Sequence, residues 1–158
     1  MLRAPLRGFL LACSYPPEFL RWAAAIGWAL FLWFMSARSD PERPFGFGGT
    51  FLWNGGHVVA FFILAGLALL ALWQRLDCPR VRGRVSILLA AGYGITDEIH
   101  QSMVPGRDCS GWDMLSDTLG ATLAVACTLW ILNLASWRPI AVLVPCCFGS
   151  VALATWGP

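Results

Sequence analysis

The residues best suited to chemistry lie together at positions 96–120, in the sequence T-D-E-I-H-Q-S-M-V-P-G-R-D-C-S-G-W-D-M-L-S-D-T-L-G. This stretch holds five of the nine acidic residues, one of the two histidines and an arginine, and it lies between two long apolar segments. Carboxylates, imidazoles and amides that converge in a water-poor place can move protons or bind a polar group. We therefore expect the functional site of the chain to be built around this stretch.

The spacing of the polar residues predicts which of them share a site. Asp97 and Gln101 are separated by four residues and lie on one face of a helix, with Glu98 beside them. The apolar part of their segment before Asp97 has only twelve residues, or about 18 Å of helix, so Asp97 and Glu98 are expected inside the membrane. His57, seven residues into the preceding segment, is expected at a similar depth.

A second stripe follows in the next segment. Asp113, Asp117 and Gly120 are spaced for one helix face, which Ala124 continues. Small residues at this spacing let two helices approach closely, which predicts that the Asp117 carboxylate lies in a seam between helices. Ionisable groups at membrane depth are costly, so they usually face the interior of a bundle and partner one another.

The elements that position these residues are membrane-spanning helices. Of the 158 residues 58% are hydrophobic and only 13% are charged, and the mean hydropathy is +0.64, outside the range of soluble domains. The apolar runs do not alternate with polar residues, which excludes a β-barrel. We predict an all-α, polytopic membrane bundle. Each span needs roughly 20 apolar residues, and the chain has about five such segments, at 19–37, 50–73, 85–104, 111–135 and 139–156.

The remaining segments are assigned around these spans. Residues 1–18 are predicted as an N-terminal interfacial segment and 19–158 as the transmembrane domain. Residues 38–49 are rich in proline and glycine and are predicted as an irregular loop, and 74–84 as a basic connection. The cysteines show no C-x-x-C spacing, which indicates no disulfide framework. The sequence has no basic patch with interleaved aromatic residues, so a nucleic-acid partner is not predicted.

The arginines predict the orientation, because cytoplasmic connections carry an excess of positive residues. Five spans place eight arginines on the side of the N-terminus and three on the other: Arg3, Arg7, Arg21, Arg75, Arg80, Arg82, Arg84 and Arg138 against Arg38, Arg43 and Arg107. The N-terminus is therefore predicted in the cytoplasm of a bacterium with the chain in the inner (cytoplasmic) membrane. The polar stretch then faces the periplasm or cell wall.

Several of these residues also have a purely structural interpretation. Ser110-x-x-Asp113 matches a capping box, so Asp113 could only satisfy the first turn of a helix. Arg107 could neutralise the acidic cluster or hold a phosphate or carboxylate. His100 could be incidental at the interface, and His57 could be a histidine that only packs between helices.

The motifs resemble those of a known family. D-E-I-H-Q-x-x-V-P-G-R at 97–107, S-x-x-D at 110–113, D-T-L-G-A at 117–121 and G-H-x-x-x-F at 56–61 are similar to the core of the VanZ-like membrane proteins, named for an accessory determinant of resistance to teicoplanin-type glycopeptides. The resemblance covers roughly 52–124. It implies functional positions at His57, Asp97, Glu98, Gln101, Arg107, Asp113 and Asp117.

We expect His57, Glu98 and Asp117 as candidate catalytic residues, and Asp97, Gln101, Arg107 and Asp113 as candidate substrate-binding residues. No cofactor or metal is predicted, since no H-E-x-x-H or comparable signature is present. The expected partner is a membrane lipid or a lipid-linked cell-wall precursor.

Three classes of function fit this pattern. The first is a membrane enzyme that performs acid–base chemistry on an envelope precursor, with a metal-dependent variant whose ligands are His57, Glu98 and Asp117. The second is a non-catalytic protein that binds a precursor, lipid or drug through the same pocket. A transporter is less favoured, because the polar groups gather at one depth instead of lining a path across the membrane.

Overall fold

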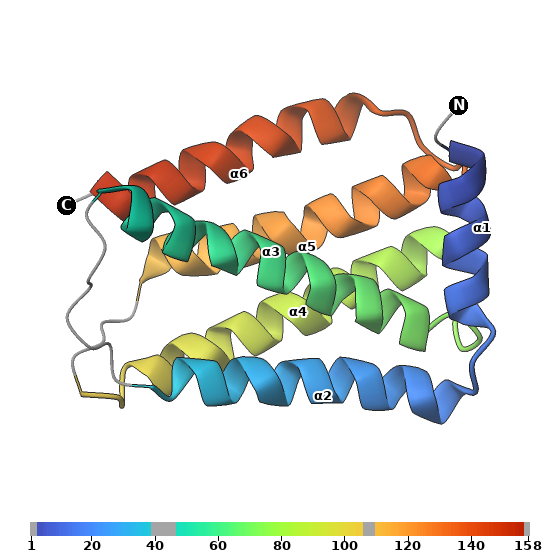
Figure 1. Ribbon diagram of the computed structural model, residues 1–158. Helices are drawn as coiled ribbons and strands as arrows, with labels where there is room; N and C mark the ends of the chain where they lie inside the picture. Colours follow the sequence, from blue (N-terminus) through green and yellow to red (C-terminus); the bar gives the residue numbers. More distant parts are fainter. Residues whose placement is uncertain (1–2, 39–46, 106–109, 157–158) are drawn as a thin grey trace.

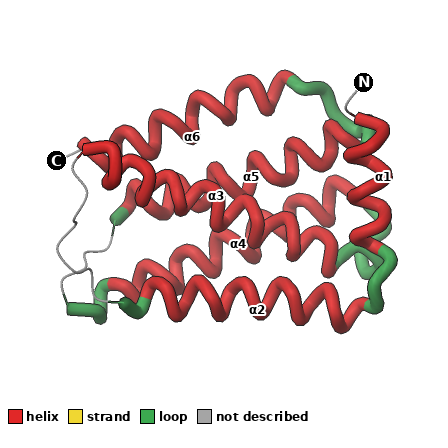
Figure 2. The backbone as a smooth tube through the Cα atoms, in the orientation of Figure 1, coloured by secondary structure: helices red, strands yellow, loops and turns green. Residues whose placement is uncertain are grey.

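A computed structural model describes residues 3–38, 47–105 and 110–156 of the chain. Within them it has helices and no strands (Figure 2). The all-α fold predicted from composition is thus confirmed. The helices are α1 (Arg3–Ser14), α2 (Glu18–Ser36), α3 (Phe47–Ala71), α4 (Pro79–Gln101), α5 (Gly111–Ile131) and α6 (Arg138–Trp156).

The five long helices α2 to α6 lie side by side, and each runs opposite to the one before it in the chain (Figure 1). The short helix α1 lies across one end of this bundle, close to the ends of α3 and α5. Arg3 helps to hold it there, because its Nη1 donates a hydrogen bond of 2.7 Å to Asn133 Oδ1, just beyond α5. The bundle therefore has an α1 end and an opposite end, where α2 and α4 stop and α3 and α5 begin.

In the part of the chain that the structure describes, four helices are long and apolar enough to cross a membrane: α2, residues 54–71 of α3, α5 and α6. The predicted third span, α4, does not reach this composition because it carries arginines in its first turns and acidic residues in its last. Its 23 residues pack against both α3 and α5, and at 1.5 Å per residue they span about 35 Å. We therefore treat α4 as a fifth crossing helix, whose polar residues Arg82, Ser86, Asp97, Glu98 and Gln101 are buried in the bundle.

The centre of the bundle is formed by α3 and α5, while α2 and α6 are the least buried of the apolar helices. Large apolar side chains of α2, such as Phe19, Ile26 and Phe34, are exposed on its outer face. In a soluble protein such a surface would be a liability, whereas here it faces lipid chains. The composition of the helices thus fits the arrangement in the bundle.

The seam between α3 and α5 depends on glycine. A Cβ at Gly120 would lie 2.3 Å from the backbone carbonyl oxygen of Val58, closer than any real contact. The two backbones touch at this point because Gly120 has no side chain. The close approach sits one residue after His57 and three after Asp117, so it also fixes the distance between those two side chains.

Two connections between helices are shorter in the structure than the sequence predicted. Residues 47–49 belong to α3 and not to the expected loop 38–49, of which 39–46 lie outside the described residues. The basic connection 74–84 ends at Cys78, and Arg80, Arg82 and Arg84 belong to α4. Proline is favoured in the first turn of a helix, where its missing N–H is not needed, so Pro79 starts α4 earlier than the apolar pattern indicated.

Candidate functional site

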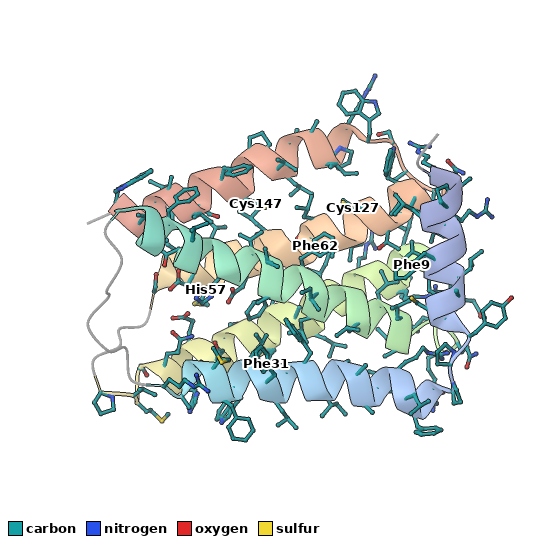
Figure 3. The ribbon with its side chains drawn as sticks, viewed as in Figure 1. Phe9, Phe31, His57, Phe62, Cys127 and Cys147 are labelled. Atoms are coloured by element: carbon teal, nitrogen blue, oxygen red, sulfur yellow. The ribbon has the colours of Figure 1, made fainter. Side chains whose placement is uncertain are left out.

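The predicted polar residues gather near the end of the bundle opposite α1, where His57 points from α3 toward the space between the helices (Figure 3). His57 Nδ1 lies 3.0 Å from Asp117 Oδ1 on α5. The Asp117 side chain is 1% exposed and that of His57 is 14% exposed. An ionised carboxylate only accepts hydrogen bonds, so with Asp117 ionised Nδ1 is the donor, and in the neutral imidazole Nε2 is then the basic nitrogen of the ring.

The second oxygen of Asp117 is buried, and no described residue forms a hydrogen bond with it. It lies where a side chain at Gly94 would be, since a Cβ at that position would be 3.1 Å from Asp117 Oδ2. A buried acceptor without a partner costs about 1–3 kcal/mol. Such groups are rare in folded proteins and are concentrated where a site needs them, which favours a functional role for Asp117.

Asp97 lies at the centre of a separate group between α2 and α4. Its Oδ1 accepts a hydrogen bond of 2.6 Å from Ser36 Oγ, and its Oδ2 accepts one of 2.7 Å from Gln101 Nε2. All three side chains are buried. His100 also belongs to this group, because its Nδ1 is 3.3 Å from Ser36 Oγ and its ring stacks on Trp33 with centroids 3.8 Å apart.

Glu98 connects α4 to the start of α5. Its Oε2 accepts a hydrogen bond of 2.7 Å from the backbone N–H of Ser110, and the Ser110 hydroxyl accepts one of 3.3 Å from the backbone N–H of Asp113. In a complete capping box the residue at the position of Asp113 would bond back to the N–H of Ser110. Here Glu98 of the neighbouring helix provides that bond, and the Asp113 side chain is left half-buried.

A cavity of about 320 Å³ lies between α2, α3 and α4 and brings part of both groups together. Its polar lining consists of Ser36, His57, Asp97 and Gln101, and the rest is largely apolar: Trp28, Phe31, Leu32, Met35, Gly56, Val59, Ala60, Phe61 and Ile63. Glu98, Asp113 and Asp117 are not among the residues that line it. Asp117 therefore lies behind His57, which is the member of the pair that lines the cavity.

The VanZ/LLP1 family model matches residues 22–133, which is most of the chain and includes most of α2 and all of α3, α4 and α5. The chain belongs to the VanZ/LLP1 family. No curated protein and no solved structure shows a significant match to it.

The VanZ/LLP1 region contains every site residue predicted from the sequence, but the structure distributes them over three places. His57, Asp97 and Gln101 line the cavity, Asp117 lies behind His57, and Glu98 and Asp113 lie at the start of α5. Arg107, predicted to hold a phosphate or carboxylate, lies outside the described residues. The roles assigned to these residues stay predictions.

The described part of this VanZ/LLP1 protein contains no group of three His, Cys, Asp or Glu side chains that could hold a metal ion. In particular, the histidine–carboxylate pair of His57 and Asp117 is not joined by Glu98 into such a group. The donors present suit proton transfer and hydrogen bonding to a polar group.

Sequence reasoning missed Ser36 and Trp28, which belong to the same VanZ/LLP1 cavity. Both face the bundle on α2, as members of the stripe Ala25, Trp28, Leu32 and Ser36. Their three- and four-residue spacing was visible in the sequence as a helix face. Since the whole segment is apolar on every side, that stripe did not stand out, and Ser36 is recognised only through its contact with Asp97.

Proposed function

We propose that this membrane protein binds an envelope lipid or a lipid-linked cell-wall precursor in its cavity and acts on it by proton transfer, altering susceptibility to teicoplanin-type glycopeptides. The proposal places the chain in the bacterial inner membrane with the cavity toward the periplasm or cell wall. The observation that carries it is the His57–Asp117 pair at a cavity whose walls are largely apolar apart from Ser36, Asp97 and Gln101.

The proposed chemistry follows from the geometry of that pair. Asp117 accepts a hydrogen bond from the Nδ1–H of His57 and so holds the imidazole in one tautomer and one orientation. Nε2 is then the nitrogen that takes a proton from a substrate group and returns it, as a general base and acid. Gln101 and Asp97, which line the same cavity, supply hydrogen bonds that orient the polar part of the ligand.

The family membership supports the connection with glycopeptides, since VanZ-like proteins take their name from teicoplanin resistance. The apolar cavity walls support a lipid ligand over a fully polar one. A non-catalytic binding protein would use the same cavity, with His57 and Asp117 as recognition groups. The two functions differ in whether proton transfer at His57 is needed.

The test compares teicoplanin susceptibility of cells that express the wild type or the variants His57→Gln, Asp117→Asn and Glu98→Gln, with membrane levels matched by immunoblot. Asp117→Asn and Glu98→Gln retain the shape and much of the hydrogen bonding of the carboxylates without transferring protons, and the His57→Gln variant keeps a polar amide in place of the imidazole. Asp77→Asn is the matched control, because Asp77 is exposed just before α4, at the α1 end.

We expect His57→Gln and Asp117→Asn to abolish the change in susceptibility while Asp77→Asn retains it. Glu98→Gln separates a structural role of Glu98 from a role in proton transfer. A glutamine oxygen still accepts the hydrogen bond from the Ser110 N–H, so a purely structural role leaves the phenotype intact. A role in proton transfer predicts that the phenotype is lost, because an amide does not donate a proton as a carboxylic acid does. Unchanged susceptibility in both the His57 and Asp117 variants would refute proton transfer and leave the binding function.

A further inference from the structure

The cavity extends away from its polar end as an apolar groove between α2 and α3. On α2 it reaches from Ser36 to Trp28, eight residues or about 12 Å of helix. On α3 it reaches from the level of His57 to Ile63. The hydrocarbon part of one leaflet is about 15 Å deep, so the groove runs through most of a leaflet.

The groove opens sideways, toward the lipid. Phe31 of α2 and Val59 of α3 both line it, yet they are 49% and 58% exposed, so they form its outer rim. Trp28 lines the groove, and its Nε1 donates a hydrogen bond of 3.0 Å to the carbonyl of Ala60, which connects α2 to α3. A hydrocarbon chain can therefore enter between these two helices and lie along them.

The polar end selects the headgroup. The described residues that line the cavity include one carboxylate, Asp97, one imidazole, His57, whose Nδ1 is paired with Asp117, and no arginine. Each Asp97 oxygen accepts one hydrogen bond, from Ser36 or Gln101, and a carboxylate oxygen has room for a second. A negative group of this kind attracts an ammonium and repels a phosphate placed at the same point.

We propose that the groove binds one acyl chain of phosphatidylethanolamine, which enters sideways between α2 and α3 and places its ammonium against Asp97. This inference rests on the proposed function, because it names the class of lipid that occupies the cavity beside His57. The ammonium donates to Asp97, and the acyl chain displaces other lipid from the walls formed by Trp28, Leu32 and Ala60.

The experiment uses photo-crosslinking of the full chain in vesicles that contain equal amounts of phosphatidylethanolamine, phosphatidylglycerol and phosphatidylcholine with identical acyl chains. A benzophenone amino acid replaces Val59 at the groove rim or Val142 on α6. Val142 is 64% exposed and reports the bulk lipid, so it is the matched control for Val59. Mass spectrometry of the crosslinked chain gives the lipid composition at each position.

We expect phosphatidylethanolamine to be enriched at position 59 relative to 142 by about tenfold, the discrimination that a charge-assisted hydrogen bond provides. Asp97→Asn is expected to remove that enrichment without changing the crosslinks at 142, which also shows that the variant remains folded in the membrane. The same composition at both positions would overturn the proposal. Enrichment of phosphatidylglycerol would overturn it too, since the site would then prefer an anion.

The two proposals fail in different ways. Phosphatidylethanolamine enrichment at 59, together with unchanged teicoplanin susceptibility in the His57 and Asp117 variants, refutes the proposed proton transfer and leaves the lipid groove standing. Loss of the phenotype in those variants without any enrichment at 59 refutes the lipid groove and leaves proton transfer standing.

Discussion

Replacing Gly120 with alanine tests the seam that holds the candidate site together. The new Cβ would lie 2.3 Å from the carbonyl oxygen of Val58 and 3.0 Å from its Cα. These are backbone atoms, which cannot rotate away as the end of a flexible side chain can. To make room, α3 has to move away from α5 next to His57, and the hydrogen bond between His57 and Asp117 lengthens.

Two effects of opposite sign determine how much Gly120→Ala changes the free energy of unfolding. Alanine favours the helix over glycine by about 1 kcal/mol. Inserting a methyl group into a closely packed contact costs about 1–3 kcal/mol, and the rigid neighbour here places the cost at the upper end. We expect a net loss of about 2 kcal/mol, which for a chain of this length lowers Tm by roughly 4–8 °C.

The assay is thermal unfolding of the purified protein in detergent, with Gly66→Ala as the control. Gly66 is also on α3, but a Cβ there meets nothing within 4 Å, so only the helix propensity changes. Gly66→Ala is expected to raise Tm slightly while Gly120→Ala lowers it and weakens the teicoplanin phenotype. If both variants unfold at or above the wild-type Tm, α3 and α5 do not approach at Gly120 as described.

Three further predictions follow from single contacts. Ser110→Ala should lower the free energy of unfolding by about 1 kcal/mol, because the variant loses the N-terminal cap of α5. Ser102→Ala is the control and should have no such effect, because the exposed Ser102 hydroxyl donates only to the nearby Ile99 carbonyl. Equal Tm values for the two variants would contradict the cap. Ser36→Ala should cost about 1–3 kcal/mol, because it removes a donor from buried Asp97, and an unchanged Tm would refute that bond. The first backbone N–H groups of α4 lower the pKa of the exposed Cys78 thiol, so it should react with an impermeant maleimide at a lower pH than an ordinary cysteine. Labelling only after permeabilisation would agree with a cytoplasmic α1 end, and labelling in intact cells would reverse the orientation.

The sequence alone was sufficient for the fold class. Long apolar runs have few stable solutions in a membrane, because every backbone N–H and C=O must be satisfied within a helix. The polar stretch at 96–120 stood out against those runs for the same reason, since buried charges are costly unless they serve a purpose. The four-residue spacing of Asp97 and Gln101 predicted their contact correctly.

Only the tertiary structure decided which of the polar residues share a space. Helix spacing relates residues within one helix but not the rotation of one helix against another, which side-chain packing at positions such as Gly120 determines. For that reason Glu98 and Asp117 were both predicted as catalytic candidates from the sequence. In the structure Asp117 forms a hydrogen bond with His57, whereas Glu98 accepts one from the backbone N–H of Ser110. The contact of Ser36 with Asp97 and the groove beside it are recognised only once α2 is packed against α3 and α4. The sequence of α2 is apolar on every side, so it does not indicate which face contacts a carboxylate.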